Sequence, residues 1–288
     1  MLDLNKIIRS NEPLGNHCSY KTGGPARFFA EPKNNLELKL TWDFLHERNL
    51  RYIVIGNGTN VLFDDAGFDG VVLSLKKLNR FMIIDKNILT AGSGILLDDM
   101  VVFSIINNLS GIEHLSGIPG TVGGAIYMNA GAFDTEIKDV VYSVEIFKDG
   151  KFTTLKASEL SFSYRKSSIK DEIIVSGSFK LNFAKNDLKK IREEILNKRG
   201  EKQPLEYPSC GSVFKRPSGT YAGKLIEECG LKGFSIGGAK VSEKHSNFII
   251  NFNNASSKDI KDLISHVKMV VFQKTGIKLE EEVKIIER

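Results

Sequence analysis

Two glycine-rich segments contain the residue types that can bind phosphate groups or a flat cofactor. The first glycine segment, residues 56–60 (GNGTN), directly follows the apolar residues 52–55, a pattern typical of a buried strand. The second glycine segment, residues 117–131, lies within LSGIPGTVGGAIYMNAGAF. Glycine-rich turns allow successive backbone N–H groups to face an anion and allow the backbone to approach a ligand closely. The two segments together predict a dinucleotide cofactor.

A Rossmann site is one interpretation of the first glycine segment, but the residues after Asn60 argue against it. That site requires a helix after the turn, because the helix N-terminus binds the pyrophosphate. The continuation VLFDDAGFDGVVLSL is turn-rich and then extended, and Val61 occupies the place of the third glycine. We therefore predict an anion-binding turn with Thr59 and Asn60 as additional donors, and a plain tight turn between strands stays open.

The second glycine segment has few charges, unlike a flexible polar linker. Its glycines are accompanied by Ile118, Val122, Ile126 and Met128. This combination predicts backbone packed against a flat apolar ligand such as an isoalloxazine ring. A tightly packed turn in the protein core is the alternative.

Composition restricts the class of protein. The chain has 288 residues, of which 41% are hydrophobic and 26% charged, as expected for a globular protein with two domains. The 40 basic and 35 acidic residues are interspersed, so the net charge of +5 is a weak indication of nucleic-acid binding. Cys18, Cys210 and Cys229 lack metal-ligand spacing and are predicted to be reduced thiols. We find no signal peptide and no transmembrane stretch, so we expect a cytoplasmic protein. The five histidines show no metal-ligand spacing, so we expect no bound metal.

Alternation, helical periodicity and turn residues predict the elements that must position these segments. The predicted strands are residues 27–30, 51–55, 70–75, 81–84, 88–91, 140–148, 151–156, 173–183, 212–215, 247–251 and 282–287, and the predicted helices are residues 35–48, 96–109, 187–198, 221–229 and 258–275. Asp149 and Gly150 predict a tight hairpin. A change in composition near Arg199 predicts a domain boundary there, followed by a small α+β unit.

Six motifs, in chain order, resemble those of the UDP-N-acetylenolpyruvoylglucosamine reductase family, which are FAD enzymes of peptidoglycan synthesis. They are SYKTGGPAR (19–27), VIGNGTNVLF (54–63), GIEHLSGIPGTVGGAIYMNAGAF (111–133), SYRKS (163–167), PSCGSVFKRP (208–217) and GIKLEEEV (276–283). The match covers essentially the whole chain. It implies an α+β fold with a two-subdomain FAD-binding domain of the vanillyl-alcohol-oxidase type in residues 1–198. It also implies a substrate-binding domain of the short form of the family in residues 199–288.

The resemblance further implies a reaction and its partners. NADPH would reduce FAD, and the flavin would then pass hydride to the β-carbon of UDP-N-acetylglucosamine enolpyruvate, giving UDP-N-acetylmuramate. Negative charge would develop on the α-carbon and its carboxylate, which the protein must stabilise before the carbon is protonated. We expect this nucleotide and NADPH as partners of a cytoplasmic monomer, and neither nucleic acid nor a membrane.

Three catalytic residues are carried over from the motifs of the family. Arg165 would grip the substrate carboxylate, Ser212 would protonate the α-carbon, and Glu282 would be the catalytic acid, in a protonated form by hypothesis. Strand alternation places Glu280 and Glu282 on one face and Glu281 on the other, and the family pattern selects Glu282. Without the motifs, we would interpret Arg165 as a surface residue and Ser212 as a turn-forming residue.

The resemblance also implies ligand-binding residues. For FAD they are Val54, Gly56, Asn57, Gly58, Thr59, Asn60, Ser116, Gly117, Pro119, Gly120, Thr121, Gly123, Gly124 and Asn129, and for the substrate Tyr127, Lys166, Gln203, Lys215 and Lys224. The chain departs from the family at Cys210, where a small residue such as alanine is usual, at Thr59, where serine is frequent, and at its IIER ending. No histidine is close in sequence to Cys210, which argues against a covalent thiol mechanism.

Two other classes of protein stay open. One is a flavin oxidase of small alcohols with the same fold, which would not need Arg165, Ser212 and Glu282 together. The other is a basic module that binds nucleic acid or a nucleotide, which predicts a colourless protein.

Overall fold

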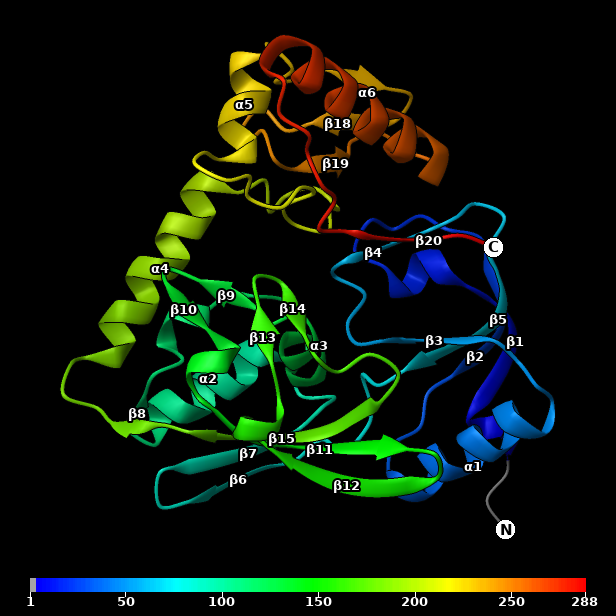
Figure 1. Cartoon of the computed structure of the whole chain (residues 1–288), viewed down its shortest axis with the longest axis vertical. Coiled ribbons are helices and arrows are strands. Elements are labelled where there is room, and N and C mark those ends of the chain that lie inside the picture. Colours follow the sequence, from blue (N-terminus) through cyan, green and yellow to red (C-terminus); the bar gives the residue numbers. More distant parts are fainter. Residues whose placement is uncertain (1–3) are drawn as a thin grey trace. The chain divides into compact units, whose positions relative to one another are not determined.

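The structure is a computed structural model that describes residues 4–288 (Figure 1). The chain forms two compact units. The first unit comprises the chain up to Ser10, Phe28–Asn57 and Gly70–Lys198. The second unit comprises Asn11–Arg27, Gly58–Asp69 and Arg199–Arg288. The chain therefore passes from one unit to the other inside the first glycine segment.

An antiparallel sheet of five strands is the main sheet of the first unit. Its order is β12 (Lys151–Lys156), β11 (Val141–Lys148), β15 (Ile173–Lys180), β7 (Ile88–Gly92) and β6 (Met82–Asp85) (Figure 1). The β11–β12 turn has φ of 48° at Asp149 and 78° at Gly150, the left-handed pair that a two-residue hairpin requires. The predicted hairpin is thus confirmed.

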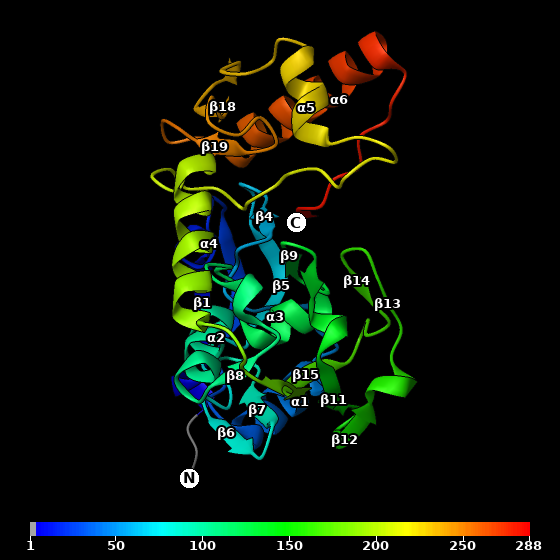
Figure 2. The same cartoon turned by 90° about the vertical axis from the view of Figure 1, so that its left-hand side faces the viewer.

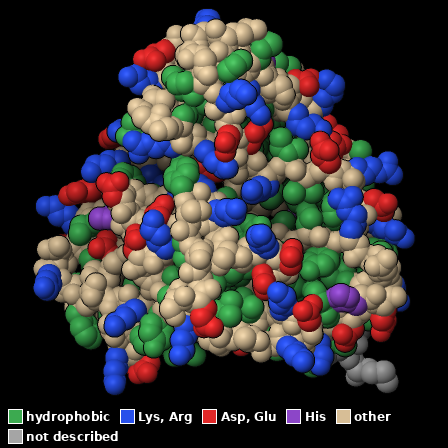
Figure 3. Space-filling model, in the orientation of Figure 1, with side chains coloured by type: hydrophobic (Ala, Val, Ile, Leu, Met, Phe, Trp, Pro, Cys, Tyr) green, Lys and Arg blue, Asp and Glu red, His purple; other side chains and the backbone are tan. Residues whose placement is uncertain are grey.

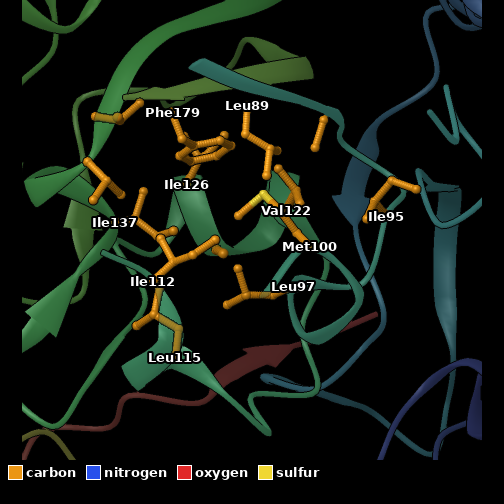
Figure 4. Packing of buried hydrophobic residues seen from close by; sticks show 14 of the residues in the cluster. Leu89, Ile95, Leu97, Met100, Ile112, Leu115, Val122, Ile126, Ile137 and Phe179 are labelled. Carbon is orange, nitrogen blue, oxygen red and sulfur yellow. The ribbon is translucent and has the colours of Figure 1, made fainter. Parts of the chain in front are cut away.

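Two helices pack beside this sheet and connect the second glycine segment to the core. They are α2 (Leu97–Ile106) and α3 (Val122–Tyr127), and α3 contacts both β15 and β7. Figure 4 shows Val122 and Ile126 of α3 among Leu89, Met100 and Phe179, all of them buried. The apolar residues of the second glycine segment therefore pack into the protein core.

A second sheet has the order β1 (Ile8–Pro13), β2 (Pro25–Ala30), β5 (Phe68–Ser74) and β3 (Tyr52–Ile55). Strands β3 and β5 run parallel, with Tyr52 opposite Val71. Helix α1 (Asn35–Glu47) begins after Asn34, whose side chain accepts a hydrogen bond from the amide of Glu37 at 2.9 Å. The first glycine segment begins directly after the end of β3, at the edge of this sheet.

The second unit contains a three-stranded antiparallel sheet and two helices. The strands are β17 (Ser235–Ile236), β18 (Ala239–Val241) and β19 (Ile249–Asn251), and the helices are α5 (Ala222–Glu228) and α6 (Ser257–Thr275). Helix α6 begins with a capping box of Ser256 and Asp259 and ends at Gly276, which has φ of 71°. Figure 2 shows α5 beside α6. Separately, β4 (Val61–Phe63) pairs in parallel with β20 (Lys284–Ile286).

The remaining elements are short, except for one helix. The strand pairs are β8 (Leu109–Ser110) with β16 (Asn182–Phe183), β9 (Gly131–Ala132) with β10 (Thr135–Glu136), and β13 (Phe162–Ser163) with β14 (Lys166–Ser167). The helix is α4 (Leu188–Lys202), and the 3-10 turns are Leu4–Lys6, Leu14–His17, Glu113–Leu115, Ile137–Asp139 and Ala157–Glu159.

The structure differs from several sequence predictions. The predicted helix 96–109 ends at Ile106, because Asn108 adopts a φ of 56° and the chain continues into β8. The predicted helix 187–198 continues to Lys202, so Gly200 lies inside the helix and does not end it. The predicted strand 212–215 forms only isolated bridges, and the second glycine segment contains the unpredicted helix α3.

Charged side chains are interspersed on the face of the molecule seen in Figure 3, with Lys and Arg next to Asp and Glu. Over residues 4–288, none of the helices combines the length and the apolar character that crossing a membrane requires.

Candidate active site

The two glycine segments contact one another within the first unit. The side-chain amide of Asn57 donates a hydrogen bond to the carbonyl of Pro119 at 2.7 Å. A Cβ atom added to Gly56 would lie 2.3 Å from the hydroxyl oxygen of Thr121. This hydroxyl caps α3 by accepting from the amide of Gly124 at 3.3 Å. Two segments that are far apart in the sequence therefore face each other with no room for a side chain at Gly56.

A buried hydroxyl without a partner among the described residues lies beside the second glycine segment. The Oγ atom of Ser93 is buried and has no hydrogen-bond partner among the described residues. A Cβ atom on Gly123 would lie 2.8 Å from the Cβ of Ser93, and the amide of Gly123 donates to the Ser93 carbonyl at 3.1 Å. A buried polar group without a partner is costly, so a ligand oxygen at this position would be favourable. The glycine backbone and this hydroxyl fit a cofactor with phosphate oxygens and a flat ring, as FAD has.

An ion pair that the sequence analysis did not identify holds the start of the second glycine segment. Oδ1 of Asp98 accepts from the Gly117 amide at 2.7 Å and from Nη1 of Arg192 at 2.6 Å, while Oδ2 accepts from Nη2 at 2.7 Å. The bidentate carboxylate raises the pKa of Arg192. Asp98 thus positions Gly117, although nothing in the local sequence pairs it with Arg192.

We expect the substitution Gly56→Ala to weaken FAD binding by about tenfold or more. The new methyl group would meet the Thr121 hydroxyl at 2.3 Å, and relieving such a contact typically costs about 1–3 kcal/mol. Equilibrium titration of the apoprotein with FAD measures the effect. Gly200→Ala is the matched control, because a Cβ atom there has no neighbour within 4 Å. Unchanged FAD affinity in the Gly56 variant would show that the contact between the glycine segments is not needed for binding.

Arg165 lies in the tight turn between β13 and β14 and contacts the end of the second glycine segment. Its backbone φ is 55°, an uncommon conformation for a residue with a side chain. Nη2 donates to the carbonyl of Gly131 at 3.1 Å, Nη1 lies 4.0 Å from a carboxylate oxygen of Glu136, and the guanidinium carbon lies 4.8 Å from the ring centre of Tyr164. The side chain is only 20% exposed. The guanidinium is therefore held in place, and Arg165 is not a freely moving surface residue.

Asn129 is fully buried and bonds to the protein around it. Its amide nitrogen donates to Glu136 at 3.0 Å and to the Ser163 carbonyl at 3.1 Å, and its oxygen accepts from the Lys138 amide at 3.0 Å. Both N–H groups of the side chain are thus used internally. Asn129 therefore joins the second glycine segment to the strand that leads to Arg165, and its role toward FAD stays a prediction.

Ser212 and Glu282 lie on adjacent backbone segments of the second unit. Ser212 bridges Phe248, and Phe214 bridges Glu281 on the other side. The amide of Glu282 donates to the carbonyl of Val213 at 2.7 Å. Segment 212–214 is therefore flanked by the chain around residue 248 and by residues 281–282, which brings together two residues that are 70 positions apart in the sequence.

The pairing at Glu282 is irregular. The carbonyl of Val213 accepts from Glu282 and also from the amide of Val283, at 3.4 Å. Two residues opposite one is the arrangement of a β-bulge, a feature that redirects side chains. The neighbouring acids pair with lysines: Glu280 lies 3.2 Å from Lys215, and Glu281 lies 2.6 Å from Lys268.

The last residue of the first glycine segment contacts the segment of Glu282. The side-chain amide of Asn60 donates to the Glu282 carbonyl at 3.2 Å, and the amide of Lys284 donates to the Asn60 carbonyl at 3.0 Å. The peptide groups on both sides of Glu282 are thereby held. We predicted Asn60 as a cofactor residue, and this contact is not evident from the sequence because it depends on the parallel pairing of β4 with β20.

Gly58 occupies a position that only glycine can take. Its φ is 68°, and a Cβ atom would lie 1.9 Å from the carbonyl oxygen of His17. The Gly58 carbonyl accepts from the Ser19 amide at 2.9 Å, and Ser19 begins the SYKTGGPAR motif. This motif therefore supports the first glycine segment.

The other predicted ligand-binding residues are placed as follows. Val54 is exposed on β3, and Ser116 is buried, with its hydroxyl donating to the Glu113 carbonyl at 2.5 Å. The Gly120 carbonyl accepts from the Leu97 amide at 2.9 Å. Of the predicted substrate residues, Tyr127, Lys166 and Lys224 are exposed, Gln203 and Lys215 are half-buried, and Lys224 lies 3.7 Å from Glu228. Thr59 is half-buried.

Between residues 4 and 288 there is no group of three or more His, Cys, Asp or Glu side chains able to hold a metal ion.

Comparison with known proteins identifies both parts of the chain. Residues 26–156 match the FAD binding domain family, and residues 203–286 match the C-terminal domain of UDP-N-acetylenolpyruvoylglucosamine reductase. A protein named UDP-N-acetylenolpyruvoylglucosamine reductase from Caldanaerobacter subterraneus subsp. tengcongensis is 45% identical over 96% of this chain and 92% of its own length. One of the same name from Clostridium perfringens is 42% identical over 98% of this chain and 93% of its own length.

A solved structure gives the same result for the fold. The crystal structure of UDP-N-acetylenolpyruvylglucosamine reductase (MurB) from Thermus caldophilus aligns with a TM-score of 0.83 and 34% identity, covering 96% of this chain and 99% of that one.

The FAD-binding match and the joined glycine segments define a flavoprotein of the α+β class, as predicted. The chain belongs to the UDP-N-acetylenolpyruvoylglucosamine reductase family. The predicted family, fold class and FAD cofactor are thus confirmed. The family assignment selects the reductase over the alcohol oxidase and over the nucleic-acid module.

Proposed function

We propose that this chain reduces the enolpyruvyl group of UDP-N-acetylglucosamine enolpyruvate to the lactyl ether of UDP-N-acetylmuramate. NADPH is the reductant, FAD is the cofactor, and the protein works as a monomer in the cytoplasm. The observation that carries the proposal is the hydrogen bond between Glu282 and Val213, which holds the catalytic acid beside the segment of the proton donor Ser212.

We assign the two steps of ligand binding to different parts of the chain. Residues 1–198 bind FAD and residues 199–288 bind the substrate. Bound FAD supplies the hydride that reduces the β-carbon of the enolpyruvyl group. The first glycine segment, residues 116–124 and the unpaired Ser93 hydroxyl hold the cofactor through backbone amides and short polar side chains.

Arg165 binds the carboxylate of the enolpyruvyl group. A guanidinium can donate two parallel hydrogen bonds to a carboxylate, and its attraction increases as negative charge accumulates there. The Gly131 carbonyl and the Tyr164 ring orient the guanidinium before the substrate arrives. Little rotational freedom is then lost when the carboxylate binds, which favours the transition state.

Ser212 donates the proton to the α-carbon, and Glu282 acts as an acid toward the carboxylate. A hydroxyl is a weak acid, but a carbon bearing developing negative charge is a strong base. Proton transfer therefore depends on a fixed geometry, and the backbone bonds on both sides of segment 212–214 supply it. The Glu282 amide is held by Val213, and the Glu282 carbonyl is held by the side-chain amide of Asn60.

We expect Glu282→Gln to keep much of the second half-reaction, losing roughly tenfold or less in rate, because an amide still donates a hydrogen bond to the carboxylate as a protonated acid would. Reoxidation of the reduced enzyme by the nucleotide, followed in a stopped-flow instrument, measures this rate. Glu280→Gln is the matched control, since Glu280 is exposed and pairs with Lys215. A near-complete loss in the Glu282 variant alone would instead assign an ionised carboxylate to the reaction.

The proposed activity is tested by NADPH consumption. The purified protein with FAD should oxidise NADPH in proportion to added UDP-N-acetylglucosamine enolpyruvate, and mass spectrometry should find the lactyl ether. NADPH oxidation that depends on oxygen, and not on this nucleotide, would contradict the proposal.

A further inference from the structure

Two buried cysteines of the second unit lie directly behind the first glycine segment. The thiols of Cys18 and Cys210 both donate to the carbonyl of Val61, at 3.0 Å and 3.2 Å, and Cys210 is also 3.8 Å from the carbonyl of Gly58. Cys18 is 2% exposed and Cys210 is 4% exposed. The reaction proposed above uses neither thiol. Two sulfur atoms that share one acceptor are close neighbours, although they come from distant parts of the sequence.

The two thiols differ in how readily they lose a proton. The neighbouring Cys210 thiol, helped by the charge of Lys21, lowers the pKa of the Cys18 thiol against the effect of burial. Burial raises the pKa of Cys210 well above its usual value. Cys18 is therefore the sulfur that loses its proton more easily, and Cys210 keeps its own. This is the arrangement of a nucleophilic cysteine beside a resolving one.

A third polar group in the same place lacks a partner. The hydroxyl of Tyr20 is fully buried and makes no hydrogen bond with any of the described residues. The two cysteines add to the effect of burial in raising its pKa, so it stays protonated. It is a donor available to a sulfur that gains negative charge or an oxygen atom. Apolar side chains would fill this region at lower cost, so the cluster of three polar groups calls for a chemical explanation.

We propose that Cys18 and Cys210 form a redox-sensitive dithiol, which hydrogen peroxide converts into a disulfide that loosens the first glycine segment. The Cys18 thiol loses its proton, its thiolate attacks one oxygen of the peroxide, and the O–O bond breaks. This leaves a sulfenic acid on Cys18 and a hydroxide that takes up the released proton to form one water. The Cys210 sulfur then attacks the Cys18 sulfur, the S–O bond breaks, and the Cys210 proton leaves with the oxygen as a second water. Both sulfurs are oxidised by one electron each, and the peroxide is reduced by two.

Oxidation removes the hydrogen-bond donors behind the glycine segment. The Val61 carbonyl loses both thiol donors, and the Gly58 carbonyl loses its contact with Cys210. A buried carbonyl without a donor is unfavourable, so the turn that begins β4 is destabilised. We therefore expect the disulfide to weaken FAD binding on the order of tenfold. This consequence rests on the proposed function, whereas formation of the disulfide does not.

The test begins with the holoenzyme and a count of its thiols. After exposure to hydrogen peroxide, the protein is denatured, alkylated and analysed by peptide mass spectrometry. We expect the free thiols to fall from three to one, with a peptide that links Cys18 to Cys210 and an unmodified Cys229. Cys229, similarly buried at the end of α5, is the internal control. Three remaining thiols, or oxidation of Cys229 at the same rate without the linked peptide, would overturn the proposal.

The second measurement separates the disulfide from its effect on flavin. FAD release from oxidised and dithiothreitol-reduced holoenzyme is compared for the natural chain, Cys210→Ala and Cys18→Ser. The natural chain should release FAD about tenfold more readily when oxidised, and neither variant should respond. If only one variant folds, that variant suffices. Equal FAD release before and after oxidation would reject the effect of the disulfide on FAD binding. A protein that binds no FAD at all would contradict the proposed function. Formation of the Cys18–Cys210 disulfide would then be tested by the thiol count.

Discussion

Replacing Ser212 by alanine is expected to slow reoxidation of the reduced flavin by the enolpyruvyl nucleotide about 10²- to 10⁴-fold. Reduction of the flavin by NADPH should keep its rate, because that step needs no proton from Ser212. Segment 212–214 keeps its backbone bonds to Phe248 and to residues 281–282 in the variant, so the fold should survive. Stopped-flow measurement of the two half-reactions separates the effects.

The control for Ser212 is Ser218→Ala, in the same stretch of chain but exposed. Its two half-reactions should match those of the natural protein. A Ser212 variant that reoxidises within a few-fold of the natural rate would remove Ser212 from its role as proton donor. In that case another protonated group would have to reach the α-carbon.

Replacing Arg165 by alanine is expected to lower kcat/KM for the nucleotide roughly 10²- to 10⁴-fold. Each charge-assisted hydrogen bond to the carboxylate contributes about 1.5–3 kcal/mol, and two are lost together. The Gly131 carbonyl also loses its donor, and the carboxylate of Glu136, 4.0 Å from Nη1, loses a nearby positive charge but keeps its ion pair with Lys138. Steady-state kinetics at varied nucleotide concentration measures the change, and NADPH reduction of the flavin should be affected far less.

Arg165→Lys distinguishes charge from geometry. A lysine keeps the positive charge but cannot donate two parallel bonds, so we expect it to recover only part of the lost kcat/KM. Arg48→Ala is the matched control, since Arg48 is exposed and its described contacts are with the adjacent Glu47 and the ring of Phe44. Equal activity of the lysine variant and the natural enzyme would contradict a bidentate grip on the carboxylate.

Local signals in the sequence predicted much of the fold. Helices α1 and α6 carry their own caps at Asn34 and Ser256, and the Asp149-Gly150 turn specifies its hairpin. Helix α3 was missed because Gly123 and Gly124 disfavour a helix in isolation. Its stability comes from the Thr121 cap and from burial of Val122 and Ile126 in the core, which no local pattern reveals.

The candidate site likewise combines residues that the sequence predicts with contacts that it does not predict. Motifs predicted Arg165, Ser212 and Glu282, but the sequence did not reveal what holds them. The contacts of Asp98 with Arg192 and of Asn60 with Glu282 join segments that are remote along the chain. Such pairs depend on strand order and helix packing, so they become visible only in the folded structure.

We expect one bound flavin to accept electrons from NADPH and to pass them to the enolpyruvyl nucleotide. The most direct test is an anaerobic experiment with two additions to the purified FAD-containing protein. One equivalent of NADPH should bleach the absorbance of the oxidised flavin, and one equivalent of UDP-N-acetylglucosamine enolpyruvate should then restore it, with formation of one equivalent of UDP-N-acetylmuramate. A flavin that stays bleached after the nucleotide is added, and regains its colour only when oxygen is admitted, would contradict the account.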